Sequence, residues 1–206
     1  GDQRDFEFAR KFGLEIIPKR RCSGGFTPNT GRVAAVLGLK PTLVGLYGAK
    51  EIDPAFEEFV DNCHLVSLGD SAVTLVFEFT NGKILLSALK SVANLTWADF
   101  AAHFPGDKLD ALFAGVDILG LGYWSLTPDF DNFLQGMVAR YDRQQAPRRM
   151  FFDFADIKKK SPESFFASLE LLKRFNGRIP MTMSLNEHEG RSEERRVGKE
   201  GRSRWS

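Results

Sequence analysis

Short apolar segments alternate with amphipathic helical segments along this chain, and this alternation restricts the fold more than any other feature. The apolar runs have the length of buried strands and lie at residues 42–46, 116–119, 150–153 and 179–185. The helical patterns between them lie at residues 29–37, 53–62, 129–144 and after Ser161. Strands joined by helices of this length need crossover connections, which favour parallel pairing. The sequence therefore predicts an α/β protein with a doubly wound, mostly parallel sheet.

Several residues mark where the predicted helices begin and end. Gly38 is suited to end the first helix, because a glycine tolerates the left-handed conformation that often follows a helix. Asp53 and Pro54 supply an N-cap and a first-turn proline. Thr96 with Asp99 three residues later resembles a capping box. These signals make the helical segments more certain than apolar periodicity alone.

One segment departs from the strand and helix alternation. Residues 73–79 alternate between apolar and polar side chains, and residues 84–87 return after Asn81 and Gly82. An Asn-Gly pair between two such runs is the strongest short-range signal for a β-hairpin, because a type I′ turn needs two positive φ angles. We therefore expect a small hairpin at about residues 71–88 that projects from the sheet as a flap.

The last sixteen residues, 191–206, differ from the rest of the chain. They are similar to the conceptual translation of a common DNA-sequencing adapter; the alternative is a natural basic tail, which would also be disordered. We interpret them as a non-native tail and residues 1–190 as a single-domain fragment, incomplete at the carboxyl end. The first residue, Gly1, leaves open a missing amino-terminal segment as well.

Composition then limits the partners and the setting. A hydrophobic content of 43% suffices for a substantial core. Residues 191–206 hold six basic and three acidic residues, so without them 22 basic and 24 acidic residues remain and the net charge changes from +1 to −2. This charge gives no reason to expect nucleic-acid binding, and no apolar run approaches the ~20 residues of a membrane span. With only Cys22 and Cys63, expected as reduced thiols, the chain fits a cytoplasmic protein.

The first candidate site is the segment from Gly24 to Asn29 at the start of a predicted helix. Adjacent glycines allow a backbone to approach a ligand closely, and the amides at a helix N-terminus favour polar or anionic groups. The side chain of Asn29 could both donate and accept hydrogen bonds to hydroxyl groups. The alternative is that Gly24 and Gly25 only make a turn and that Asn29 only caps the helix.

The second candidate site contains Asn186 and Glu189, which follow the last predicted strand. Ligands of open α/β sheets bind at the carboxyl ends of the strands. Amide and carboxylate oxygens three residues apart could share a hydrated Mg²⁺. The alternative is a helix start in which Asn186 is the N-cap and Glu189 completes a capping box. Elsewhere the chain has no P-loop pattern, and Gly120 and Gly122 lack the third glycine of a dinucleotide-binding fingerprint.

Together these segments resemble the ribokinase-like, or PfkB, family of sugar and nucleoside kinases over about residues 12–190. The family carries a Gly-Gly with a following Asn at a helix start, then Leu-Gly, Gly-x-x-Gly, a Gly-Tyr after a central strand, a strand-end Asp and an Asn-x-x-Glu. The residues that match are Gly24, Gly25, Asn29, Leu37, Gly38, Gly45, Gly48, Gly122, Tyr123, Asp153, Asn186 and Glu189. The predicted hairpin matches the family's lid.

The resemblance implies a carbohydrate kinase that transfers a phosphoryl group from ATP to a sugar hydroxyl with Mg²⁺. It assigns substrate hydroxyls to Gly24, Gly25 and Asn29, and it assigns Mg²⁺ and phosphate to Asn186 and Glu189. Asp153 is a further candidate, although the residues after it depart from the family pattern. The expected partners are a small-molecule sugar and a nucleotide, and the exposed edges of the lid suggest a homodimer.

One departure concerns catalysis. The family has a Gly-x-Gly-Asp near its carboxyl end that supplies an anion hole and the catalytic base, and nothing in this sequence matches it. We therefore expect the base to lie outside this chain and the fragment itself to be inactive. The alternatives are an ADP-dependent sugar kinase or a nucleoside kinase of the same fold, or a non-catalytic protein that binds a sugar or nucleotide.

Overall fold

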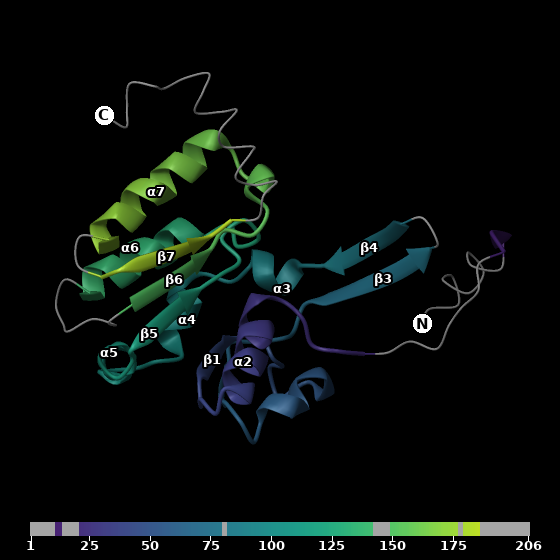
Figure 1. Ribbon diagram of the computed structural model, residues 1–206, viewed down its shortest axis with the longest axis horizontal. Helices are drawn as coiled ribbons and strands as arrows, with labels where there is room; N and C mark the ends of the chain where they lie inside the picture. The colour runs from purple at the N-terminus through teal and green to yellow at the C-terminus, as the bar shows by residue number, and fades with distance from the viewer. Residues whose placement is uncertain (1–10, 14–20, 80–81, 142–148, 177–178, 186–206) are drawn as a thin grey trace.

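The computed structural model describes residues 11–13, 21–79, 82–141, 149–176 and 179–185. Within these ranges the chain is a mixed α/β protein with parallel strands, as the sequence predicts (Figure 1). The second candidate site, Asn186 and Glu189, and the tail of residues 191–206 lie outside the described residues. None of the described helices is both long enough and apolar enough to span a bilayer.

The elements of the first half are α2 (Phe26–Val36), β1 (Thr42–Gly45), the 3-10 helix η1 (Pro54–Phe59), β2 (His64–Ser67), β3 (Val73–Phe79) and β4 (Gly82–Ala88). Those of the second half are α3 (Lys90–Ala93), α4 (Trp97–Ala102), α5 (Lys108–Ala114), β5 (Ile118–Leu121), α6 (Phe130–Tyr141), β6 (Arg149–Asp153), η2 (Ile157–Lys159), α7 (Pro162–Asn176) and β7 (Met181–Ser184).

The second half is built on a three-stranded parallel sheet with the order β5-β6-β7. Helices α6 and α7 connect these strands and pack on each other, so both cover the same face (Figure 1). This is the expected result of two successive crossovers of the same hand. In β6, Met150 and Phe152 are buried in the main core, whereas Phe151 between them points to the opposite face.

The first half has its own, smaller arrangement. Strands β1 and β2 form a two-stranded parallel sheet, with α2 and η1 packed beside it. Its buried cluster consists of Leu43, Tyr47, Phe56 and Phe59. Helix α2 approaches β1 closely at Gly31, where a Cβ would lie 2.5 Å from the Leu43 side chain. Val44 of β1 packs against the main core, which joins the two halves.

Strands β3 and β4 form the antiparallel hairpin that the sequence predicts, and the hairpin extends away from the other sheets and helices (Figure 1). Its register differs from the prediction. Gly82 pairs with Phe79 and is the first residue of β4, so Gly82 belongs to the strand rather than to the turn. The two residues between the strands, 80 and 81, are not described. Every residue of β4 is exposed.

Two of the predicted helix signals are confirmed in detail. Gly38 has a φ of 75°, and its N–H bonds to the carbonyl of Ala35 while the Leu39 N–H bonds to that of Ala34. This pair of hydrogen bonds is a Schellman motif. Thr96 and Asp99 form a complete capping box, in which each side chain bonds to the other residue's backbone N–H.

Other predictions were wrong in position or extent. Strand β2 was not predicted, because its four residues show no clear alternation and owe their structure to pairing with β1. Residues 54–59 form a 3-10 helix rather than a longer α-helix. Strand β5 begins at Ile118, since the preceding residues end α5 and turn. The described strands also form three separate sheets instead of the single doubly wound sheet.

Candidate functional site

The amino-terminal end of α2 carries the first candidate site. The helix begins earlier than predicted: Gly25 is the N-cap, with a φ of 99°, and Asn29 lies in the first turn, where its N–H bonds to the Gly25 carbonyl. Asn29 is therefore not the helix cap. The N-cap residue, Gly25, makes no side-chain hydrogen bond to this helix end, and the first backbone amides of any helix lack helical partners. Such an end favours polar or anionic groups.

Phe26 packs this helix end against the face of the three-stranded sheet that lies opposite α6 and α7. Its ring stacks on Phe151 with a centroid distance of 5.9 Å and an interplanar angle of 6°. The ring lies over Gly120 and Gly122, and a Cβ on Gly122 would be 2.3 Å from the Phe26 ring. Gly120 and Gly122 thus make room for the Phe26 ring. They do not form a dinucleotide-binding fingerprint.

Tyr123 meets Gly25 directly after β5. A Cβ on Gly25 would lie 1.8 Å from the Tyr123 hydroxyl oxygen, so only glycine fits at this position. Tyr123 itself has a φ of 67°, which is uncommon for a residue with a bulky side chain. Burial raises the pKa of Tyr123, a hydrogen bond with the Phe26 backbone opposes the shift, and the charge of Asp153 adds to it.

Asp153 ends β6 beside this contact. Burial raises the pKa of its carboxyl group, and a hydrogen bond from the Ala155 backbone N–H opposes that shift. A carboxylate that is poorly solvated favours a hydrogen-bond donor or a cation as a partner. The departure from the family pattern after Asp153 has a structural role, because Phe154 is fully buried in the core and Asp156 caps η2.

Tyr47 is a buried residue near Tyr123 that the sequence interpretation did not single out. It lies two residues after β1, is 2% exposed, and its hydroxyl oxygen has no hydrogen bond of normal geometry among the described residues. Burial raises its pKa, while the nearby Thr27 hydroxyl opposes the shift and Tyr123 adds to it. The only sequence signal was an aromatic residue between Gly45 and Gly48.

Tyr47, Tyr123 and Asp153 lie at the carboxyl ends of β1, β5 and β6, and each of these strands belongs to a parallel sheet. In α/β proteins, ligands bind at this end of the strands. Of the predicted site residues, the structure places Gly25 and Asp153 next to Tyr123, a residue of the matched family motif. Gly24 comes just before Gly25 in the sequence, and a Cβ added to Gly24 would have no atom within 4 Å. Asn29 is exposed one helical turn further on. Strand β7 ends at Ser184, which is paired with Asp153, but the residues of the second candidate site are not described.

The described residues contain no group of three or more histidine, cysteine, aspartate and glutamate side chains that could hold a metal ion. Among the candidate site residues that the structure describes, Asp153 is the one carboxylate. Mg²⁺ usually takes only one or two carboxylates and completes its shell with water and substrate phosphates. Asp153 therefore fits a contribution to such a site, but not a complete protein ligand set.

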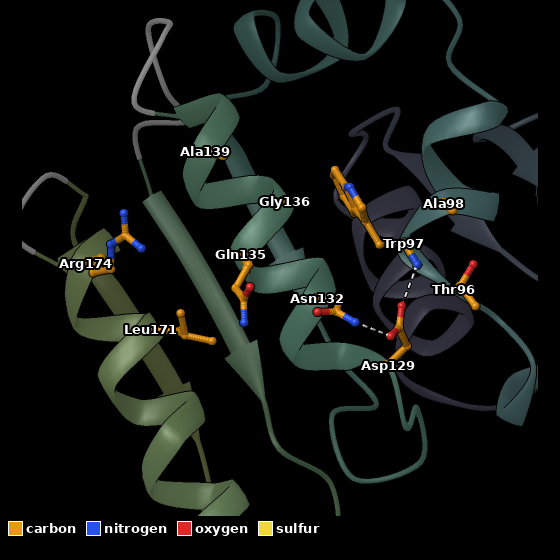
Figure 2. A pocket seen from close by; sticks show the side chains of 10 residues that line it. All are labelled: Thr96, Trp97, Ala98, Asp129, Asn132, Gln135, Gly136, Ala139, Leu171 and Arg174. Atoms are coloured by element: carbon orange, nitrogen blue, oxygen red, sulfur yellow. Dashed lines mark hydrogen bonds between the residues drawn. The ribbon is translucent and has the colours of Figure 1, made fainter.

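A separate surface hollow of about 810 Å³ lies between α4, α6 and α7, and none of the predicted site residues lines it (Figure 2). One of its polar groups, Asp129 at the start of α6, accepts a hydrogen bond from the Trp97 N–H of α4 at 2.8 Å and another from Asn132 Nδ2 at 2.6 Å. The Trp97 ring lies against Gly136, where a Cβ would be 2.2 Å from the ring. We assign this hollow a structural origin.

A glycine-bearing helix end beside the carboxyl ends of parallel strands is the kind of place where α/β proteins bind polar ligands. The chain matches the family model of the prokaryotic ketohexokinases over residues 6–205, and it belongs to this family. A ketohexokinase from Haloferax volcanii is 27% identical over 180 residues, which are 86% of this chain and 48% of that protein. The chain thus spans about half the length of this curated relative. No solved structure gave a significant match.

Proposed function

We propose that the natural protein is a sugar kinase that transfers the terminal phosphoryl group of ATP to a hydroxyl group of a ketohexose. One observation carries this proposal: in a chain of the prokaryotic ketohexokinase family, the glycine-bearing end of α2 meets Tyr123 and Asp153 at the carboxyl ends of the strands. The relative from Haloferax volcanii is a ketohexokinase, which supports a ketohexose as the substrate.

We propose substrate contacts for the residues at the start of α2 that a ligand can reach. Gly24 and Gly25 present backbone to the ligand, and the exposed side chain of Asn29 supplies hydrogen bonds to sugar hydroxyls. The rigid packing of Gly25 against Tyr123 would hold the sugar in one orientation. Phosphoryl transfer depends mainly on such positioning and on the stabilisation of charge.

The proposed cofactor is Mg²⁺, with ATP as the donor. Asp153, with Asn186 and Glu189 from outside the described residues, would help to hold it through carboxylate and amide oxygens. When bound, the ion would neutralise phosphate charge during transfer. The hairpin of β3 and β4 is proposed as the lid that excludes water from this reaction.

We further propose that this chain has no turnover, because no Gly-x-Gly-Asp is present to supply the base. A coupled assay with ATP and D-fructose tests this directly, and any phosphorylation above the blank would contradict it. In a longer chain that includes such a motif, the same residues should support turnover. An extended chain that binds D-fructose without turnover would favour the alternative of a non-catalytic sugar-binding protein.

The binding part of the proposal can be tested on this chain by isothermal titration calorimetry with D-fructose. We expect Asn29→Ala to weaken binding by about 10-fold, the value of one or two lost hydrogen bonds. Asn132→Ala is a matched control, since Asn132 is also exposed near a helix start and bonded to a side chain three residues away. Tighter binding of adenosine than of D-fructose would instead identify a nucleoside kinase.

The nucleotide donor remains a separate question within the proposal. We propose ATP, with ADP as the alternative that related sugar kinases of this fold use. Turnover of the extended natural chain with each nucleotide in turn distinguishes the two. Activity with ADP alone would overturn the choice of donor and leave the sugar assignment unchanged.

We propose from the sequence that residues 191–206 are not native. The family match ends at residue 205 and therefore includes most of this segment, which favours the natural tail as the alternative. Sequencing the source DNA across the codon for Gly190 decides between the two. A reading frame that continues differently supports the adapter interpretation, and a genomic sequence that encodes 191–206 contradicts it.

We also propose a cytoplasmic homodimer. Cys22 and Cys63 are free thiols in the structure, as predicted, and this suits a reducing compartment. The hairpin exposes apolar side chains, with Leu85 at 53% and Leu86 at 55% exposure. Isolated two-stranded hairpins are only marginally stable in water, so pairing of the hairpins from two copies would stabilise both.

A further inference from the structure

Arg32 of α2 lies at the centre of a hydrogen-bond network beside the proposed sugar site. Its Nε bonds to Oε2 of Glu58 at 3.1 Å and its Nη2 to Oε1 at 2.6 Å, which is a bidentate pairing. Nη2 also bonds to Ser23 Oγ at 2.7 Å, and Ser23 in turn donates to Glu58 Oε1 at 2.6 Å. The guanidinium lies over the Phe59 ring, 5.6 Å from its centroid. Two of the three guanidinium nitrogens of Arg32, Nε and Nη2, are thus hydrogen-bonded to Glu58 of η1 or to Ser23.

The remaining nitrogen, Nη1, bonds to Oδ1 of Asn29 at 3.0 Å. Arginine only donates hydrogen bonds, so the oxygen of the Asn29 amide must face Arg32. The Nδ2 group then points elsewhere, and within the described part of the chain it has no hydrogen-bond partner. Asn29 is exposed, so this donor group is accessible to a ligand.

The network is not needed to hold the helix in place. The side chains of Arg32 and Glu58 are 41% and 45% exposed, and ion pairs so exposed contribute little to stability. Helix α2 is instead held by packing, through Phe26 on Phe151 and Gly31 on Leu43. What the network does provide is orientation, because a bidentate arginine fork permits only one geometry.

We propose that Arg32, held by Glu58, is a positioning residue that fixes the Asn29 amide with its NH₂ group toward the substrate. Asn29 then offers donors only, and it selects an oxygen that accepts hydrogen bonds, such as a hydroxyl or carbonyl oxygen of a ketohexose. This inference rests on the proposed function, because that function gives Asn29 its substrate.

A double-mutant cycle on D-fructose binding tests whether Arg32 acts through Asn29. Calorimetry on the full chain would compare wild type, Arg32→Ala, Asn29→Ala and the double variant. We expect Arg32→Ala to weaken binding by about 3- to 10-fold, and we expect the double variant to bind no more weakly than Asn29→Ala. Equal losses from Arg32→Ala in both backgrounds would overturn the inference.

The matched control for the arginine is Arg140→Ala. Arg140 also lies on a helix and pairs with a carboxylate, Asp110, at 2.6 Å, but it is remote in sequence from the site residues. It should leave D-fructose binding unchanged. A loss as large as that of Arg32→Ala would show a general effect of removing a helix ion pair and would overturn the inference.

A second measurement requires no sugar. Nitrogen-15 relaxation of the Asn29 side-chain amide should show a rigid NH₂ group in the wild type and in Arg140→Ala, and a mobile group in Arg32→Ala. Equal mobility in the wild type and Arg32→Ala would overturn the inference. Failure of the wild type to bind D-fructose would count against the proposed function alone, and the relaxation result would still decide the role of Arg32.

Discussion

The two halves of the molecule use similar parallel strands but bury them very differently. The three-stranded sheet with α6 and α7 belongs to a core of 17 buried residues, whereas the α2, β1, η1 and β2 region has a buried cluster of four. The larger half can therefore depend on its own core, while the smaller half also depends on its contacts with the larger one. The candidate site lies at this junction, so its geometry depends on the less well buried half.

The largest effect should come from the core of the larger half. Phe152 is fully buried and lies against Phe154 with a centroid distance of 4.6 Å. Phe152→Ala should lower the free energy of unfolding by about 3–5 kcal/mol, because it leaves a cavity in a packed core. Urea unfolding followed by far-ultraviolet circular dichroism measures this change.

A control keeps this prediction testable if Phe152→Ala does not fold. Phe152→Leu removes less volume and should cost clearly less. The same truncation in the smaller half, Phe56→Ala, should cost less than Phe152→Ala, because its cluster has fewer buried neighbours. Equal losses at Phe152 and Phe56 would contradict the comparison between the two halves.

The junction itself should give the second largest effect. Gly25→Ala places a Cβ on the Tyr123 hydroxyl at a φ of 99°, so both strain and overlap oppose it. We expect a loss of about 2–3 kcal/mol, measured by the same unfolding experiment. Gly24→Ala is the matched control, because its Cβ meets nothing within 4 Å, and stability should not change. If both variants lose equal stability, the Tyr123 contact is not what requires glycine.

The sequence predicted the elements whose signals are local. The Schellman motif at Gly38 and the capping box of Thr96 and Asp99 involve residues within five positions of one another, so their pattern is complete in the sequence. Helix α7 likewise begins at the predicted Pro162. A local signal failed at the start of α2, where two residues could serve as the N-cap. The N-cap is Gly25 instead of Asn29.

The parts that could not be predicted depend on contacts between distant segments. Strand β2 becomes a strand only by pairing with β1, and Gly122 is required because Phe26 packs over it. The candidate site is a mixed case. Motifs identified Gly25, Tyr123 and Asp153 one by one, but their meeting, and the buried Tyr47 beside them, appear only when the strand ends are placed together.

A smaller effect should appear at low pH in the smaller half. Hydrogen bonds from Arg32 and Ser23 lower the pKa of Glu58 from 4.5 to about 2. A lowered pKa in the folded state stabilises the fold above pH 4.5, and this contribution is lost as the pH falls from 4.5 toward 2. Since the pair is half-exposed, the loss should stay below about 1 kcal/mol.

Hydrogen exchange of the α2 amides at pH 5 and pH 3 locates this effect. Glu58→Gln should reduce protection at pH 5 and make the difference between the two pH values smaller. The control is Glu57→Gln, an exposed neighbour for which the wild-type pattern should persist. An unchanged pH difference in Glu58→Gln would show that another group carries the acid sensitivity of this half.

The smallest effect on stability should come from the hairpin, although its strands are as apolar as those of the core. Leu85 pairs with Val76, and the two side chains remain 53% and 49% exposed. Leu85→Lys should therefore change the free energy of unfolding by no more than about 0.5 kcal/mol at a protein concentration where the chain is monomeric. Together with Phe152→Ala, this variant tests whether an apolar strand stabilises the protein only when another layer covers it. If the hairpins of two copies supply that layer, light scattering should show a dimer for the wild type and a monomer for Leu85→Lys. A wild-type monomer at all concentrations would reject the proposed dimer and leave the stability prediction in place.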